Sequence, residues 1–162
     1  MHKPLRDTGL PGGILRLLMR APILLYDAGL GFILGGRFLM LTHIGRSSGR
    51  PKRVVLEVIK SDPESGIYYI GSGWGEKANW LLNIEKTSEV RVQTGNKVFD
   101  ALTSRLNANQ ASDILLDYGG RNPKAFRMLA GRLIVGKDLD ISEESAALLA
   151  QYIPIVAVSA VR

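Results

Sequence analysis

Cysteine is absent from this 162-residue sequence, and histidine occurs only twice, as His2 and His43. The absence of cysteine excludes disulfides, thiolate catalysis and cysteine-ligated metals. No histidine or carboxylate cluster has the spacing of metal ligands, so we expect no metal site. A serine–histidine–aspartate triad would depend on His43, which alternates within an apparent strand, and no G-x-S-x-G motif is present. We therefore expect His43 to be a packed histidine and the side chains to offer little covalent chemistry.

Long hydrophobic runs are also lacking. The most apolar segment, APILLYDAGLGFILGG (21–36), is interrupted by Asp27 and bounded by Arg20 and Arg37. It is shorter than the roughly 20 apolar residues that a membrane-spanning helix needs. No small-residue cleavage site follows a clean apolar core, so we see no secretory signal. We expect a cytoplasmic protein in which residues 14–36 form either a buried helix pair or a peripheral contact with a membrane.

Acidic residues are in deficit, with 15 Asp and Glu against 21 Lys and Arg, which gives a net charge of +6. A positive excess favours anionic partners such as nucleic acid, anionic lipid or a phosphorylated small molecule, but it does not choose among them. The chain length and the 46% hydrophobic content suit one domain with a substantial core. We find no internal repeat, low-complexity tract or linker.

The stretch LTHIGRSSGRPKRVV (41–55) concentrates positive charge between two apolar runs. Its four cations, within eight residues, are Arg46, Arg50, Lys52 and Arg53. The glycines of this stretch permit backbone conformations that direct several N–H groups into one concavity, and Ser47 and Ser48 add hydroxyl donors. Arginine side chains add planar forks that match phosphate oxygens. The stretch therefore predicts an anion site, although a solvated basic loop has the same composition.

Other phosphate-binding patterns do not fit this chain. The basic loop lacks the glycine spacing and the GK[ST] ending of a Walker motif, and GSGWGE (71–76) does not satisfy G-x-G-x-x-G. Nucleic acid is disfavoured because the cations gather at one loop, whereas a strand-tracking protein spreads them along a groove. The anion site and nearby tryptophans instead suit a protein that takes its chemistry from a phosphorylated aromatic cofactor.

Residue patterns predict about six strands, with helices before, between and after them. The expected strands are 37–44, 53–60, 67–72, 89–94, 97–106 and 153–161, and the expected helical segments are 13–34 (broken near 29–31), 73–86, 109–118, 123–133 and 140–151. Hairpin-like neighbours favour antiparallel pairing, and the absence of regular strand–helix alternation argues against a doubly wound sheet. We therefore expect an α+β protein built on a small β-barrel with flanking helices.

Three local patterns refine this expectation. Within 53–60, Val54, Leu56 and Val58 share one strand face and Val55, Glu57 and Ile59 share the other. The segment 153–161 is almost wholly apolar, which indicates a strand buried on both faces. Asp140 followed by Glu143 is typical of a capping box that opens the last helix.

Three segments together resemble the deazaflavin-dependent nitroreductase family: LTHIGRSSGRPKRVVLEVI, YYIGSGWGEKANWLLNIEKTSEVRVQTG and the closing IPIVAV. The resemblance implies a split β-barrel of the FMN-binding type and the use of coenzyme F420. It also implies one domain over 1–162, in which an apolar helical segment (1–36) precedes a cofactor-binding barrel core (37–106) and a part with helices and the closing strand (107–162).

The resemblance further implies how the site is used. Arg46, Ser47, Ser48, Lys52 and Arg53 match the positions that grip the phosphate and acidic tail of the cofactor. The backbone at Val54 and Val55 would lie along the deazaflavin ring, a second loop would contribute Ser72, Gly73 and Trp74, and Lys77, Asn79, Trp80 and Asn83 would line the same cleft. Relatives commonly have lysine where this chain has Ser47. The serine removes one positive charge from the site, and Arg50 compensates for it.

Two roles stay open for each tryptophan. Trp80 either packs in the core or faces the cofactor, and Trp74, between two glycines, is either a mobile exposed residue or a lid that contacts the substrate. The proton donor is not assigned, because Tyr68, Tyr69 and Tyr118 are equivalent candidates in the sequence.

The family resemblance predicts an oxidoreductase that transfers a hydride from reduced F420 to an electron-poor acceptor such as a quinone, an enone or a nitro compound. The same barrel with FMN, or a non-catalytic F420 carrier at a membrane surface, is the alternative. Split barrels often pair, so a homodimer is compatible with the sequence.

Overall fold

The computed structural model of the chain describes residues 13–134 and 139–162. Within them, the strands are β1 (Phe38–Ile44), β2 (Pro51–Asp62), β3 (Ile67–Gly71), β4 (Glu89–Thr94), β5 (Lys97–Arg105) and β6 (Ile155–Ala160). The α-helices are α1 (Gly13–Asp27), α2 (Asn79–Lys86), α3 (Ala108–Arg121), α4 (Pro123–Leu133) and α5 (Glu143–Ala150). Two 3₁₀ segments, η1 (Gly31–Arg37) and η2 (Gly75–Lys77), complete the elements.

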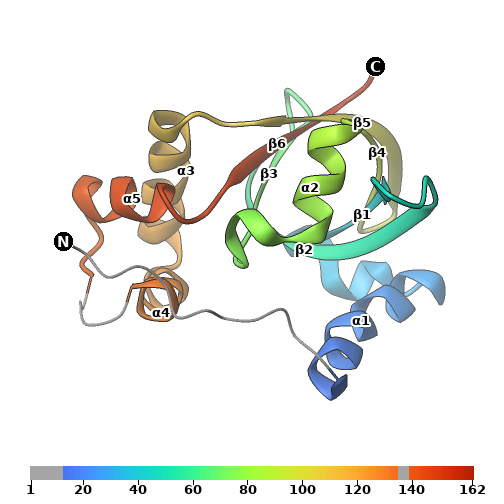
Figure 1. Cartoon of the computed structure of the whole chain (residues 1–162), viewed down its shortest axis with the longest axis horizontal. Helices are drawn as coiled ribbons and strands as arrows, with labels where there is room; N and C mark the ends of the chain where they lie inside the picture. The colour runs from blue at the N-terminus through green and yellow to red at the C-terminus, as the bar shows by residue number, and fades with distance from the viewer. Residues whose placement is uncertain (1–12, 135–138) are drawn as a thin grey trace.

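The six strands form one closed barrel in the order β1-β2-β3-β6-β5-β4. Every strand pair in it is antiparallel, as hairpin-like neighbours require. The α+β class and the split-barrel type expected from the sequence are confirmed. Figure 1 shows α2 lying across one end of the barrel, with α1 beside the barrel and the helices α3, α4 and α5 gathered on another side.

The barrel interior is filled by side chains that alternate inward along each strand, together with one face of α2. The buried members of this barrel core are Leu39, Leu41, Ile70, Ala78, Trp80, Leu81, Ile84, Val90, Val92, Ala101, Val156 and Val158. Val54, Leu56 and Val58 pack against the same core, as their shared strand face predicted. The ladder between β2 and β3 has a register shift between Val58 and Lys60, after which the pairing continues to Asp62.

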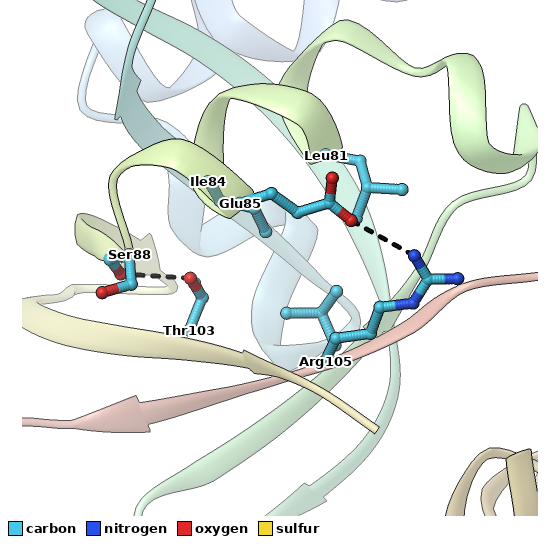
Figure 2. Close-up of a pocket in the computed structure, with 7 residues that line it drawn as sticks. Leu81, Ile84, Glu85, Ser88, Thr103 and Arg105 are labelled. Atoms are coloured by element: carbon cyan, nitrogen blue, oxygen red, sulfur yellow. Dashed lines mark hydrogen bonds and ion pairs between the residues drawn. The ribbon is translucent and has the colours of Figure 1, made fainter. Parts of the chain in front are cut away.

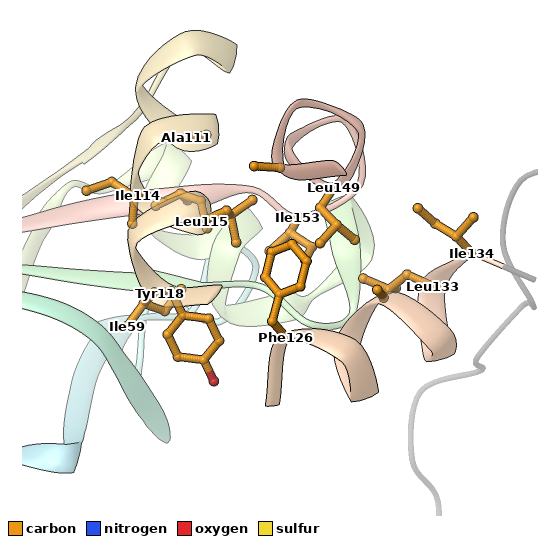
Figure 3. Close-up of a cluster of buried hydrophobic side chains, with 13 residues drawn as sticks. Ile59, Ala111, Ile114, Leu115, Tyr118, Phe126, Leu133, Ile134, Leu149 and Ile153 are labelled. Carbon is orange, nitrogen blue, oxygen red and sulfur yellow. The ribbon is translucent and has the colours of Figure 1, made fainter. Parts of the chain in front are cut away.

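A second core lies between the barrel and the helical layer of α3, α4 and α5. Figure 3 shows Phe126 of α4 pointing toward Leu149 of α5 and Ile153, with Ile59 of β2 at the opposite edge of the group. Phe126 is fully buried, with a relative exposure of 0%. Strand β6 serves both cores, because Ile155 belongs to the helical-layer core and Val156 to the barrel core. The prediction of a strand buried on both faces is thus confirmed.

The segment before the barrel contains α1 and η1, with the break that the glycines predicted. Tyr26 closes this break by donating a hydrogen bond to the Phe38 carbonyl (3.1 Å), and its ring leaves no room for a Cβ atom at Gly31. Gly35 has φ +55° and kinks η1, a conformation that favours glycine. Among the described residues, no helix is both long enough and apolar enough to span a bilayer.

The start of α5 differs from the capping-box prediction. Ser142, not Asp140, is the N-cap residue, and its Oγ accepts a hydrogen bond from the Ser145 backbone N–H (3.2 Å). Asp140 lies two residues earlier, where its Oδ1 accepts from the Ser142 and Ser145 hydroxyls at 3.1 and 3.0 Å. The acidic residue therefore supports the cap from outside, because only Ser142 has the three-residue spacing to a free N–H of the first turn.

Candidate functional site

The basic stretch forms a tight hairpin loop between β1 and β2, at residues 45–50. The Gly45 N–H donates to the Arg50 carbonyl (2.9 Å), and the Gly49 N–H donates to the Gly45 carbonyl (2.8 Å). Gly49 has φ +65°, and a Cβ atom at Gly45 would lie 2.5 Å from the Ser48 Oγ. Both glycines are therefore required by the turn. The side chains of Ser47, Ser48 and Arg50 are exposed around it.

Arg46 is exposed, but its side chain binds helix α2. Its backbone N–H and its Nη1 both donate to Asn83 Oδ1 at 3.0 Å. Its Nη2 donates to Asn79 Oδ1 (3.2 Å). Lys86, at the end of the same helix, donates from Nζ to the Arg46 carbonyl (2.8 Å). Three of the predicted site residues, Arg46, Asn79 and Asn83, are thus brought together by direct contacts between hairpin and helix.

Strand β2 has an unpaired edge beside this hairpin. Residues 51–57 pair with β1, but the ladder with β3 begins only at Val58, opposite Ile70. Alternate N–H and C=O groups of residues 51–57 therefore point away from β1 without a strand partner among the described residues. Strand β3 ends at Gly71, so the loop from Ser72 to Lys77 follows the point where this edge opens. This unpaired edge leaves backbone donors and acceptors of β2 available to a ligand.

The glycine loop after β3 is held in shape by its own hydrogen bonds. Ser72 is buried, donates from its N–H to the Pro154 carbonyl (2.9 Å) and from Oγ to the Gly75 carbonyl (2.7 Å). Glu76 forms an ion pair with Arg105 of β5, and Arg105 also binds Glu85 of α2 (3.2 Å). Ser72 therefore shapes this loop internally, and Arg105 ties it to the barrel.

The two tryptophans have different surroundings. Trp80 has a relative exposure of 7% and belongs to the barrel core, so the structure places it among packing residues. Trp74 in the glycine loop is half-buried, and the Arg132 guanidinium of α4 stacks over its ring with the Cζ atom 4.1 Å from the ring centre. Because arginine attracts an indole face, this contact holds Trp74 between the loop and the helical layer.

Arg53 is separated from the other cations of the hairpin. Successive strand residues point to opposite faces, so Lys52 and Arg53 leave β2 in opposite directions. Arg53 instead forms an ion pair with Asp27 at the end of α1. The role of Arg53 at the acidic tail of a cofactor stays a prediction. Lys77 is exposed at the end of η2, next in the chain to α2.

His43 is a residue whose contact the sequence did not predict. It is 4% exposed, and its Nδ1 lies 3.1 Å from Asn83 Nδ2. Burial, and then the positive charge of Lys52, lower the pKa of His43 to about 4. Its polarity within an apolar strand was the only available signal, because its partner lies 40 residues away. The described residues contain no group of three histidine or carboxylate side chains that could hold a metal ion.

Two cavities lie outside the hairpin. One, of about 290 Å³, lies between α2 and β5 and is lined by Leu81, Ile84, Glu85, Ser88, Thr103, Arg105 and Val156. Figure 2 shows its rim closed by the Glu85–Arg105 ion pair and by the hydrogen bond from the Thr103 hydroxyl to the Ser88 carbonyl.

The second cavity, of about 370 Å³, is polar and lies between η1, β2 and the end of α3. Its lining includes Arg37, Glu57, Lys60, Tyr118 and Arg121. Tyr118 is 6% exposed, and burial, followed by the negative charge of Glu57, raises the pKa of its hydroxyl. Figure 3 shows this hydroxyl pointing away from the helical-layer core. Tyr68 stacks on Phe99 and Tyr69 packs against the helical layer, so Tyr118 is the tyrosine that lines a polar cavity.

Comparison with known families gives one match that spans more than half of the chain. Residues 26–123 match the model of the F420H2-dependent quinone reductase family. No curated protein matches the sequence. The matched range contains the hairpin, the unpaired edge of β2, the glycine loop and helix α2.

Several solved structures are similar to this chain. The F420H2-dependent reductase FDR-A has a TM-score of 0.48 and 18% identity, over 76% of this chain and 94% of that chain. The heme storage protein HutZ of Vibrio cholerae has a TM-score of 0.52 and 14% identity, over 85% of this chain and 91% of that chain. A putative 5-nitroimidazole antibiotic resistance protein of Bacteroides thetaiotaomicron has a TM-score of 0.50 and 10% identity, over 81% and 76%. At these identities the last two structures establish the shared fold alone.

Proposed function

The chain belongs to the F420H2-dependent quinone reductase family, and from this premise we propose that it transfers a hydride from reduced F420 to a quinone. It is an oxidoreductase that uses coenzyme F420, which decides between the two cofactors that the sequence left open. The observation that carries the proposed binding mode is the unpaired edge of β2, between the basic hairpin and the glycine loop. When bound, F420 supplies the hydride, and the protein supplies position and charge.

The donors around this opening fit the anionic part of F420, which carries a phosphate and several carboxylates. Lys52 and Arg50 are exposed and have no ion pair within the described part of the chain, so their charge is available. Ser47 and Ser48 add hydroxyl donors on the same loop, and Arg46 is fixed at its base by α2. These residues would hold the phosphate and the acidic tail.

The ring would lie against the backbone of Val54 and Val55, whose alternate polar groups lack a strand partner on that side. Gly73 and Trp74 of the second loop would cover the ring. There is open space beside Gly73, since no atom lies within 4 Å of the position that a Cβ atom there would occupy. Lys77 would add charge from the end of that loop. Ser72, Asn83 and Trp80 are buried, so their part is to shape the loop, hold Arg46 and pack the core.

The acceptor would bind at the polar cavity beside Tyr118. This cavity is lined by residues 57–61 of β2, which continue the strand from the unpaired edge. A quinone that accepts a hydride needs one proton to become a hydroquinone. Tyr118 is the proton donor favoured among the three tyrosines, because it alone of the three lines this polar cavity and a tyrosine hydroxyl is protonated at neutral pH.

The acceptor class is supported by the family description and by an apolar surface near the cavity. One short segment carries four exposed large hydrophobic residues: Leu24 on α1, Leu30 in the turn that follows, and Phe32 and Ile33 on η1. Exposed Arg20 and Arg37 flank this segment, which suits an anionic membrane surface. A membrane contact would give access to a lipid-soluble quinone. Enones and nitro compounds are the alternative acceptors. We also propose that the protein forms a homodimer.

The decisive experiment removes a pair of cations from the basic hairpin and, as a control, a pair from the β4–β5 hairpin. We expect the Arg50→Ala/Lys52→Ala variant to bind F420 roughly 100-fold more weakly, since each charge-assisted hydrogen bond contributes about 1.5–3 kcal/mol and about 1.4 kcal/mol is tenfold. Fluorescence titration with F420, with FMN as competitor, measures the affinity. The control variant Arg91→Ala/Lys97→Ala removes the same charge from the β4–β5 hairpin and should bind normally.

Equal affinity in the two variants would contradict the assignment of the hairpin. Binding of F420 without turnover of quinones, enones or nitroaromatic compounds would identify a carrier instead of an enzyme.

A further inference from the structure

His43, Asn83 and Arg46 form a series of contacts from the barrel to the basic hairpin. His43 Nδ1 lies 3.1 Å from Asn83 Nδ2, and Asn83 Oδ1 accepts two hydrogen bonds from Arg46, each of 3.0 Å. His43 and Asn83 are both only 4% exposed. The contact between His43 and Asn83 therefore lies out of water, where a hydrogen bond has few competitors, whereas Arg46 is exposed.

The chemistry of the three groups permits one arrangement only. Arginine and the backbone N–H are donors without acceptor capacity, so Asn83 must present Oδ1 to Arg46. Its Nδ2 then faces His43 as a donor. The Nδ1 atom of His43 must accept this hydrogen bond, which requires a neutral ring with its proton on Nε2. Arg46 thus determines the orientation of the Asn83 amide, and the amide determines the tautomer of His43.

We infer that His43 is a positioning residue that holds Asn83, and through it Arg46, in the orientation that binds the anionic part of F420. The described contacts of the guanidinium use both N–H groups of Nη1 and one of Nη2, directed to Asn83 and Asn79. They leave the Nε–H and one Nη2–H for a bound anion. Without the acceptor at His43, the Asn83 amide loses its fixed orientation, and the guanidinium loses the partner that directs those free donors.

This inference rests on the proposed role of the hairpin. Its test therefore measures the contact between His43 and Asn83 and the affinity for F420 in separate experiments. Nitrogen NMR of the unliganded protein reports the His43 tautomer and the coupling across the N–H···N hydrogen bond to Asn83. The chain has only one other histidine, His2, so a His2→Gln variant assigns the signals. We expect an Nε2-protonated ring with a measurable coupling. An Nδ1-protonated ring, or absence of the coupling, overturns the inference.

The affinity test uses two variants of similar size. His43→Leu removes the acceptor, whereas His43→Asn keeps an oxygen near the position of Nδ1. We expect His43→Leu to weaken F420 binding about tenfold and His43→Asn to restore it to within about threefold, with unfolding midpoints measured in parallel. A purely structural histidine would lower stability in both variants and affinity in neither. If His43→Leu does not fold, His43→Val, which also lacks an acceptor, replaces it.

The outcomes separate the two hypotheses. If the wild-type protein does not bind F420, the proposed function fails, whatever the NMR result. If the wild-type protein binds F420 and the leucine or valine variant binds it equally well, only the role of His43 is refuted.

Discussion

At the scale of single residues, the cations of the hairpin differ in how the protein uses them. Arg46 is fixed by Asn79 and Asn83, and Arg53 is paired with Asp27 on the other face of β2. Lys52 and Arg50 carry exposed charge. Affinity for an anion therefore depends on Lys52, Arg50 and the free N–H groups of Arg46, because the partners of Arg46 are uncharged groups of Asn79 and Asn83 that leave its charge uncompensated.

Replacement of Tyr118 tests its proposed role as the proton donor. We expect Tyr118→Phe to lower kcat with a quinone about 100-fold, because a general acid contributes roughly 10²–10⁴-fold. The affinity for F420 should stay unchanged, since the cavity of Tyr118 is separate from the hairpin. Steady-state kinetics and fluorescence titration measure the two quantities.

The matched control is Tyr68→Phe, which removes the hydroxyl of a tyrosine that stacks on Phe99 in the barrel. An equal loss of kcat in both variants would refute Tyr118 as the proton donor and point to solvent.

At the scale of elements, β2 determines where the site lies. It is the longest strand among the described residues, at 12 residues, and its partners change along its length. Its first part pairs with β1 and contacts α1 through Arg53, while its second part pairs with β3 and contacts α3 through Ile59. Because β3 is only 5 residues long, one edge of β2 stays unpaired beside the glycine loop.

The exposed apolar residues of η1 provide a test of the proposed membrane contact. We expect Phe32→Ser/Ile33→Ser to weaken binding to vesicles that contain anionic lipid by at least about tenfold, since each buried apolar side chain of this size contributes roughly 1.5–3 kcal/mol. Their side chains are 55% and 61% exposed, so the change should leave folding intact. Vesicle flotation measures binding, and F420 affinity should not change.

A variant with two exposed apolar residues changed elsewhere, Val98→Ser/Met128→Ser, is the control. If both double variants bind vesicles as strongly as the wild type, the proposed membrane contact of this segment is wrong.

At the scale of the whole molecule, two cores share strand β6. Residues of the barrel core lie on one face of this strand and residues of the helical-layer core on the other. The glycine loop connects the two parts, because Trp74 contacts Arg132 of α4 while Ser72 binds the Pro154 carbonyl just before β6. The glycine loop therefore depends on both cores for its shape.

The stability of the whole molecule should depend on pH through His43. Its pKa is about 4 in the folded protein, against 6.5 for the free side chain. Between pH 4 and 6.5 the unfolded chain therefore binds more protons than the folded protein. The stability that depends on a neutral His43 is complete above pH 6.5 and is lost as the pH falls toward 4. The loss reaches about 3 kcal/mol at pH 4, since one pKa unit corresponds to about 1.4 kcal/mol.

Urea unfolding of the wild type and of His43→Asn at several pH values measures this effect, because the carboxylates titrate in both proteins and cancel. We expect the difference in unfolding free energy to shift in favour of the variant below pH 6.5. A difference that stays constant down to pH 4.5 would contradict the lowered pKa.

Local sequence patterns predicted the strands and helices and the chemistry of the hairpin. Strand alternation separated Val54, Leu56 and Val58 from Ile59, and the glycine and cation spacing located the loop, because these properties depend on neighbours along the chain. These patterns also identified the family, through motifs that lie close together in sequence.

Which of those residues come into contact depends on how the chain folds in three dimensions. The ion pair of Arg53 with Asp27, the stacking of Arg132 on Trp74 and the contact of His43 with Asn83 join residues 26, 58 and 40 positions apart. No local pattern contains such distances, since they follow from how the barrel closes and where the helices pack. For the same reason the unpaired edge of β2, on which the proposed binding mode rests, became visible only when the barrel was closed.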